Sequence, residues 1–262
     1  MNPTDLVAAL GARTINVLGS LGHASAFSAA LARHIAPAFR RFQLTVGQIH
    51  AIGNYSLVII ITSGAAVGGV LALQSYYSLA RYGAADSVGL LVALALLREL
   101  GPVLSALLYA GRAGTSLTAE LGLMKAGEQL TAMEMMAVDP MGRVLAPRFV
   151  AGVIAMPILG AVFSMSGVCS AYVVAVKLIG LDAAQFWSTM QDGVDVFEDV
   201  GNGILKTIVF GIATTFIALY VGYECKPTPE GVARATTSTV VVSSLAVLIL
   251  DFLLTAVMFG RP

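Results

Sequence analysis

The chain has 262 residues, of which 57% are hydrophobic and only 11% are charged, and its formal net charge is zero. A water-soluble domain of this length carries about 25% charged residues, so the composition indicates an integral membrane protein. The zero net charge gives no indication of nucleic-acid binding, and Cys169 and Cys225 lie in an apolar run and a polar loop that do not suggest a disulfide.

The N-terminal region, residues 6–45, is expected to form an amphipathic helix. Its apolar residues fall near one helical face: Val17, Leu18, Leu21, Phe27, Leu31, Ile35 and Phe39. Such a pattern suits a helix that lies in the cytoplasmic membrane interface, and a helix that packs on a cytoplasmic partner is the alternative. The first residues lack a basic segment followed by an apolar run, so no cleavable signal peptide is expected.

Five later segments are long and apolar enough to cross a bilayer as helices, which makes the predicted fold all-α. They are residues 55–73, 88–109, 148–176, 204–222 and 240–259. In the first of them, Gly64, Gly68 and Gly69 allow another helix to approach closely. Pro157 is a position at which the third can bend.

The distribution of Lys and Arg predicts the orientation. Ten of the fifteen basic residues precede the first span or lie between spans two and three or spans four and five. The segment between spans three and four instead carries Asp182, Asp192, Asp195, Glu198 and Asp199. The N-terminus is therefore expected in the cytoplasm and the C-terminus on the outer side.

Arg98 and Glu99 stand side by side in the second span, within LALLRELGPVL. A charged side chain at the bilayer centre costs about 2.5–3.5 kcal/mol, so each needs a partner or water. Neighbouring helix positions point about 100° apart, so the two do not simply face each other. Asp251 in the fifth span and Lys206 in the fourth are the residues of opposite charge within other spans, and we expect an Arg98–Asp251 or a Glu99–Lys206 pair. These charges either only lock helix packing or line a polar cavity.

The segment between spans two and three is too long for a tight turn. Residues 119–136 consist of helix formers with apolar residues near helical spacing, and Asp139-Pro140 ends the pattern. An amphipathic helix in a cytoplasmic loop can dock in the groove of a soluble partner. A helix that rests on the membrane surface fits the pattern equally well.

The run RELGPVLSALLYAGRAGTSLTAELGLMKAGEQLTAMEMMAVDPMGRVLAPR resembles the core signature of the MlaE/YrbE-type permeases, the membrane subunits of ABC transporters associated with Mce-domain proteins. The matching elements are R-E-L-G-P at 98–102, A-G-R at 110–112, A-E-L-G at 119–122, M-K at 124–125, E-Q at 128–129, A-x-E-x-M at 132–136, V-D-P at 138–140 and P-R at 147–148. The five-span layout extends the resemblance over nearly the whole chain.

The resemblance implies a homodimeric permease in the bacterial inner membrane, without a catalytic centre or cofactor of its own. ATP would be hydrolysed by a separate cytoplasmic ATPase, coupled through Glu120, Lys125, Glu128, Gln129, Glu134 and Asp139. The substrate would be a phospholipid, exchanged with a periplasmic Mce-domain partner to maintain outer-membrane lipid asymmetry. The sequence agrees, because VGNGILKT at 200–207 lacks the glycines of a Walker A motif.

A lipid-binding site is expected at the outer end of span one, with Leu71, Leu79 and Tyr82 as apolar walls and Arg98 and Glu99 as polar groups. The default position of aromatic residues at membrane interfaces explains Tyr82 equally well.

Two other functions remain open from the residues alone. A proton-coupled secondary transporter would use Glu99 and Asp251 as proton relays, although five spans without an inverted repeat argue against it. A non-transporting membrane scaffold would need only the cytoplasmic helix. The three histidines precede the first span and have no clustered Cys or carboxylate partners, so no metal site is expected.

Overall fold

The computed structural model of the chain describes residues 19, 22–38 and 42–259, and these are helical apart from short connections, with no β-strand among them. Five helical runs are long and apolar enough to span a membrane: Gln43–Ala80, Ala85–Ala126, Met141–Leu178, Val196–Glu224 and Pro229–Met258. The first four each contain one of the predicted spans, and the fifth covers residues 240–258 of the predicted span 240–259. The all-α prediction is therefore confirmed over the part of the chain that the structure describes.

Two of the spans are single helices, whereas the others contain short π-helical turns. The elements in chain order are α2 (Phe42–Ala80), η1 (Ala85–Ser87), α3 (Val88–Leu94), η2 (Ala95–Leu100), α4 (Gly101–Tyr109), η3 (Ala110–Gly114), α5 (Thr115–Ala126), α6 (Gln129–Met135), η4 (Met141–Leu145), α7 (Ala146–Tyr172), η5 (Val173–Leu178), α8 (Ala183–Gly193), η6 (Val196–Val200), α9 (Gly201–Glu224) and α10 (Pro229–Phe259). Apart from η1, which is a 3₁₀ turn, the η segments are π-helical.

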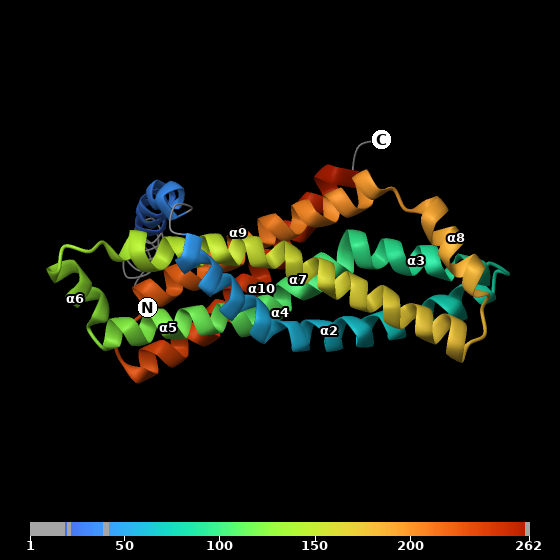
Figure 1. Ribbon diagram of the computed structural model, residues 1–262, viewed down its shortest axis with the longest axis horizontal. Helices are drawn as coiled ribbons and strands as arrows, with labels where there is room; N and C mark the ends of the chain where they lie inside the picture. Colours follow the sequence, from blue (N-terminus) through green and yellow to red (C-terminus); the bar gives the residue numbers. More distant parts are fainter. Residues whose placement is uncertain (1–18, 20–21, 39–41, 260–262) are drawn as a thin grey trace, which may run out of the picture.

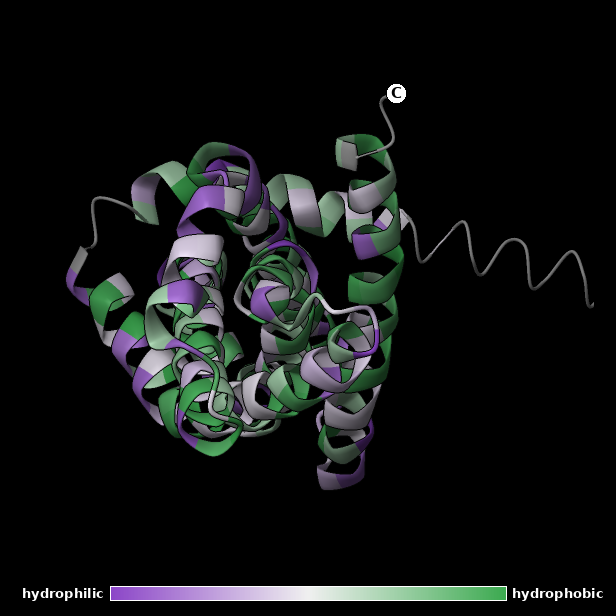
Figure 2. Ribbon diagram, turned by 90° about the vertical axis from the view of Figure 1, so that its right-hand side faces the viewer, coloured by the Kyte–Doolittle hydropathy of each residue, from purple (hydrophilic) through white to green (hydrophobic). Residues whose placement is uncertain are grey.

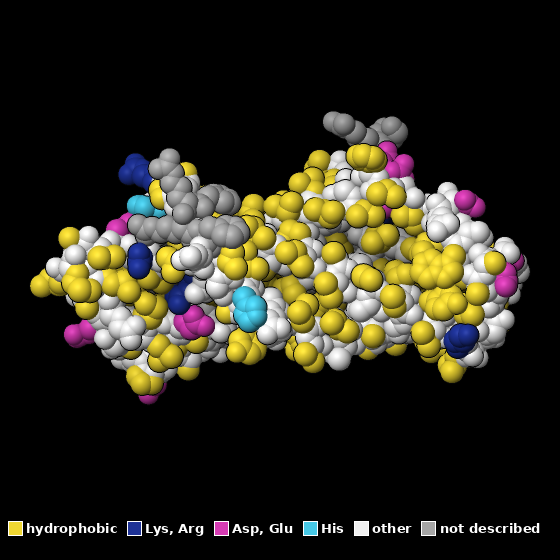
Figure 3. Space-filling model, viewed as in Figure 1, with side chains coloured by type: hydrophobic (Ala, Val, Ile, Leu, Met, Phe, Trp, Pro, Cys, Tyr) yellow, Lys and Arg dark blue, Asp and Glu magenta, His cyan; other side chains and the backbone are white. Residues whose placement is uncertain are grey.

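The long helices run side by side in an elongated bundle, with α6 at one end and α8 at the other (Figure 1). Viewed along the bundle, α10, which leads to the C-terminus, is hydrophobic over most of its length (Figure 2). Hydrophobic side chains cover the middle of the bundle on the face in Figure 3, and most charged side chains there lie toward the two ends. This distribution is the one expected of a helical membrane protein.

Close contact between α2 and α7 depends on glycines. A Cβ atom at Gly68 would lie 2.0 Å from the carbonyl oxygen of Gly167, and one at Gly64 would lie 2.6 Å from that of Phe163. No larger side chain fits at either position without moving a backbone. The prediction that these glycines allow close helix approach is confirmed.

The helix over residues 22–38 lies against the α6 end of the bundle (Figure 1). Phe27 and Leu31 are buried, and the Phe27 ring lies 5.5–5.7 Å from the rings of Phe216, Tyr220 and Tyr223 on α9. The predicted apolar face is thus seen to pack on the chain's own α7 and α9. Four of the predicted face residues, Val17, Leu18, Leu21 and Phe39, lie outside the described residues.

The prediction of one helix over residues 119–136 is wrong. The second span continues as α5 to Ala126, and a separate short helix, α6, follows from Gln129 to Met135. Between them, Glu128 adopts a left-handed backbone with φ of 54°. Gly127 is the physical reason, because glycine is unfavourable inside a helix and marks helix ends. Its N–H donates to the carbonyl of Leu123 at 2.9 Å and closes the last turn of α5.

Candidate functional site

Lys206 on α9 lies at the centre of a cluster that ties three spans together. Its side chain is fully buried, and its Nζ atom lies 2.7 Å from Glu99 Oε2 on η2. The same ammonium donates to Thr255 Oγ1 on α10 at 2.7 Å and lies 3.1 Å from Asp251 Oδ1, also on α10. The Thr255 hydroxyl in turn lies 3.3 Å from Glu99 Oε2. The cluster is therefore a connected network between the second, fourth and fifth spans.

Arg98 takes a different partner from the one predicted. The structure confirms the Glu99–Lys206 pair, but Arg98 pairs with Asp199 of η6, so the predicted Arg98–Asp251 pair is wrong. The second carboxylate oxygen of Asp199 accepts the backbone N–H of Asp195 at 2.9 Å. The Asp199 side chain is completely buried, although the sequence placed this residue in the acidic segment outside the membrane.

One signal in the sequence could have identified Asp199. It precedes Lys206 by seven residues, which is about two helical turns, so both side chains lie on one face of a continuous helix. The structure begins the fourth helical run at Val196, earlier than the predicted start at residue 204. Arg98 can then pair with Asp199 while Glu99 pairs with Lys206, because the two partners lie about two turns apart on one face of the fourth span.

The π-helical turn η2 carries both Arg98 and Glu99. Pro102 follows it and has no N–H to donate to the carbonyl of Arg98, so regular α-helical bonding cannot continue there. At Gly101, a Cβ atom would lie 2.2 Å from Ser164 Oγ on α7 and 2.3 Å from the Leu96 carbonyl oxygen. The sequence R-E-L-G-P thus combines the charges with the residues that shape the turn. Such π turns occur frequently at functional sites.

The proposed lipid-wall residues, on α2 and in the turn after it, do not join this cluster. Leu71 and Leu79 are partly buried and pack against the main hydrophobic core. Tyr82 lies in the turn after α2 and is 85% exposed. A role in lipid binding therefore stays a prediction for all three.

Three of the six predicted ATPase-coupling residues hold this chain's own elements together. Glu120 pairs with Arg148 at 3.0 Å, which joins α5 to the start of α7. Lys125 donates to the carbonyl of Tyr223 at 2.6 Å near the end of α9, and Asp139 lies 2.9 Å from His34 Nε2.

The other three, Glu128, Gln129 and Glu134, are exposed on and next to α6. Sequence reasoning did not single out Met135 and Met136, which are 87% and 68% exposed at the same place.

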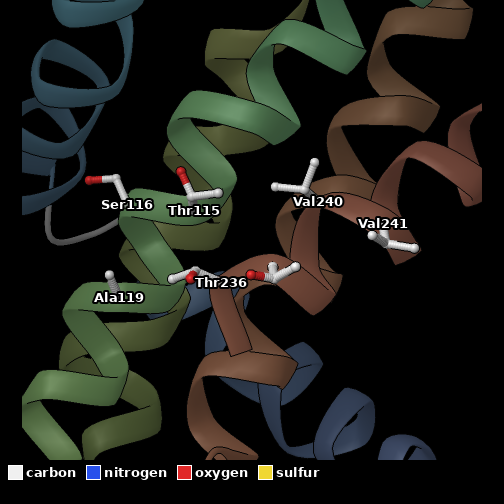
Figure 4. Close-up of a pocket in the computed structure, with 7 residues that line it drawn as sticks. Thr115, Ser116, Ala119, Thr236, Val240 and Val241 are labelled. Carbon is white, nitrogen blue, oxygen red and sulfur yellow. The ribbon is translucent and has the colours of Figure 1, made fainter. Parts of the chain in front are cut away.

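A shallow hollow separates α5 from α10 (Figure 4). Its lining residues are Thr115, Ser116, Ala119, Thr236, Thr237, Val240 and Val241. The threonine hydroxyls bond to carbonyls of their own helices, for example Thr115 to Gly111 at 2.8 Å and Thr236 to Ala233 at 2.8 Å. The surface is therefore uncharged and has few unsatisfied polar groups. Among the described residues, no group of His, Cys, Asp or Glu side chains could hold a metal ion.

Taken together, five apolar spans and the ion pairs between them define a multi-pass helical membrane protein with ionisable residues among its spans, as in membrane transporters. The family model described as permease MlaE matches residues 45–257, and the chain belongs to this family.

The relatives support the assignment over the full length. The chain is 51% identical to the intermembrane phospholipid transport system permease protein MlaE of Haemophilus influenzae, over 98% of both chains. It is 36% identical to a probable ABC transporter permease protein of Rickettsia bellii, over 97% of this chain and 98% of the relative. It is 29% identical to the chloroplastic protein TRIGALACTOSYLDIACYLGLYCEROL 1 of Arabidopsis thaliana, over 82% of this chain and 61% of the relative.

Proposed function

We propose that this chain is the permease subunit of an ABC transporter that moves phospholipids between the inner membrane and a periplasmic Mce-domain partner, and so maintains outer-membrane lipid asymmetry. The observation that carries the proposal is the 51% identity, over 98% of both chains, to a permease of intermembrane phospholipid transport. The Lys206 and Arg98 ion pairs support it, because charges enclosed between spans are typical of transport proteins.

The α6 end of the bundle is proposed to face the cytoplasm. Basic residues belong to the segments at this end: Arg112, Lys125, Arg143, Arg148, Lys226 and Arg234. The acidic segment of α8 and η6 lies at the opposite end (Figure 1). The positive-inside rule then places the N-terminus in the cytoplasm and the C-terminus in the periplasm.

The α6 helix is proposed to contact a separate ATPase, which would bind the ATP. Met135 and Met136 are large exposed apolar side chains next to the exposed carboxylates of Glu128 and Glu134. Apolar anchors surrounded by polar residues are typical of a helix that docks in a partner's groove. The Asp139–His34 pair would pass a movement of the segment after α6 to the helix over residues 22–38, and the Glu120–Arg148 pair would tie α5, which leads into α6, to α7.

A second copy of the chain is proposed to cover α10. In the most apolar 18-residue window of this span only 11% of the residues are buried, compared with 33–50% in the other four spans. The uncharged hollow between α5 and α10 lies on the same surface (Figure 4). Small and hydroxyl residues favour close contact between membrane helices, which suits a homodimer.

The test is affinity purification of the tagged chain from its native membrane in mild detergent, followed by ATPase assay and lipid identification. We expect an ATPase and phospholipid to co-purify with the wild type. Met135→Glu and Glu128→Lys should each lose the ATPase and keep the lipid. Val196→Glu, which adds a charge at an exposed apolar position on the opposite end, should keep both. A wild-type protein that carries neither would overturn the proposal in favour of proton-coupled transport or a scaffold.

A further inference from the structure

A cavity of about 410 Å³ lies among the second, third and fourth spans and α8, and none of the charged residues described above lines it. Its walls include Leu97, Met165, Cys169, Trp187, Met190 and Ile204. None of the predicted lipid-wall residues Leu71, Leu79 and Tyr82 is among the residues that line it. The volume falls within the range of about 300–1,000 Å³ that is usual for small-molecule sites.

The chemistry of the lining selects an apolar occupant. No charged side chain lines the cavity. Of its polar side chains, Ser164 donates its hydroxyl to the Leu96 carbonyl at 3.3 Å and Thr207 donates to the Ile204 carbonyl at 2.7 Å. These hydroxyls are already satisfied by backbone, so the cavity offers little to a polar ligand, whose own groups would be desolvated without compensation.

The position of the cavity indicates where its occupant comes from. Three of its walls belong to spans, so the medium at its rim is the hydrocarbon of the bilayer. Met165 is 71% exposed and Cys169 is also exposed, so the α7 wall of the cavity reaches the surface of the bundle. Its inner wall is closed, because a Cβ atom at Gly203 would lie 2.3 Å from the carbonyl oxygen of Leu97.

We propose that this cavity binds a single hydrocarbon chain of a membrane lipid, whose headgroup stays outside it. The uncharged lining excludes a phosphate headgroup, and the membrane depth supplies acyl chains at high concentration. The site is separate from the transported lipid of the proposed function, and it requires neither ATP nor a partner. A phospholipid tail and a free fatty acid share this chemistry.

The chain contains a natural reporter for the test, since Trp187 is its only tryptophan and lines the cavity. The full chain, purified in detergent without other proteins so that Trp187 is the only tryptophan in the sample, is titrated with a phospholipid or a fatty acid that carries bromine on the acyl chain. Bromine quenches tryptophan fluorescence at short range, so an occupied cavity should give saturable quenching of Trp187. Saturable quenching by either ligand supports the proposal, and the ligand that saturates shows whether the bound hydrocarbon chain comes from a phospholipid or from a fatty acid.

Two variants of α7 separate the cavity from the detergent surroundings. Ala161→Phe fills the cavity, which Ala161 lines, and should weaken saturable quenching by about tenfold or more. Ile158→Phe enlarges a side chain that is 53% exposed on the same helix and does not line the cavity, so quenching should be unchanged. Quenching that rises without saturation and equally in all three proteins would overturn the proposal, while leaving the transport function untouched.

Cys169 gives a second measurement that does not depend on the Ala161→Phe substitution. In a Cys225→Ala background it is the only cysteine. Its alkylation by a membrane-permeant maleimide should slow as unbrominated phospholipid or fatty acid is added. If Cys169 is instead protected from alkylation only when another protein co-purifies, and added lipid has no effect, a partner's helix occupies the site. That result would overturn the proposal.

Discussion

Lys206 Nζ lies 2.7 Å from Glu99 Oε2, although the two residues belong to different spans and are 107 positions apart in the chain. The burial of the pair is unequal, because the Lys206 side chain is fully buried and that of Glu99 is 38% exposed. Lys206 therefore depends on its protein partners, whereas Glu99 can also be hydrated or meet another molecule. The ammonium, more than either carboxylate, holds the three spans together.

Replacement of Lys206 by methionine should destabilise the protein by roughly 3 kcal/mol, because loss of one partner leaves charges uncompensated inside the bundle. Glu99 and Asp251 would then face each other with no cation between them. Thermal unfolding in detergent measures the effect. Asp251→Asn is the matched control and should cost less, since Lys206 keeps Glu99 and Thr255. Equal melting temperatures for wild type and Lys206→Met would show that the cluster does not stabilise the fold.

The Arg98–Asp199 pair should behave as a coupled unit. Arg98→Gln leaves the buried Asp199 carboxylate without its guanidinium, whereas a second change, Asp199→Asn, removes that charge as well. The double variant should therefore be more stable than Arg98→Gln alone, with a coupling of about 0.5–3 kcal/mol. A double-mutant cycle of unfolding free energies measures this. Additive effects would contradict the pairing.

The parts of the structure that sequence predicted are those governed by hydrophobicity and helix sterics. The five spans and the close approach at Gly64 and Gly68 follow from local patterns. Asp199 was missed because hydropathy does not mark the start of the helical run at Val196, where the Asp195 side chain caps the helix by accepting the N–H groups of Phe197 and Glu198. Its partner Arg98 is 101 positions away in the chain, so the pair is not visible in a local pattern. The break at Glu128 was missed because the pattern of helix formers outweighed the single stop signal of Gly127.

The lateral cavity could not be found from sequence, for a related reason. Its lining comes from seven elements, and residues such as Met165 and Trp187 follow the ordinary apolar pattern of membrane segments. Only their arrangement in space distinguishes a cavity wall from a lipid-facing surface.

Gly68→Ala should destabilise the contact between α2 and α7, because the added methyl would lie 2.0 Å from the Gly167 carbonyl oxygen. Helix backbones must move apart to accept it, and overpacking of this kind costs about 1–3 kcal/mol. Gly53→Ala is the matched control on the same helix, where a Cβ atom meets nothing within 4 Å. That change should be neutral or slightly stabilising, as alanine is the better helix former. The two melting temperatures, measured in one detergent, compare the effects directly, and an equal loss in both variants would argue against close contact at Gly68.

Cys225 should react with a water-soluble maleimide only at unusually alkaline pH. Burial raises the pKa of its thiol above the ordinary value, although the nearby Lys125 ammonium acts in the opposite direction. The thiolate is the reactive form, so below the pKa the rate should rise about tenfold per pH unit and continue to rise past about pH 8.5, where an ordinary thiol levels off. A Cys169→Ala background leaves Cys225 as the only thiol. Lys125→Met should move the midpoint still higher, because it removes the charge that favours the thiolate. A midpoint at or below the ordinary value, or one that falls in the Lys125 variant, would contradict the burial of Cys225 between α5 and the start of α10.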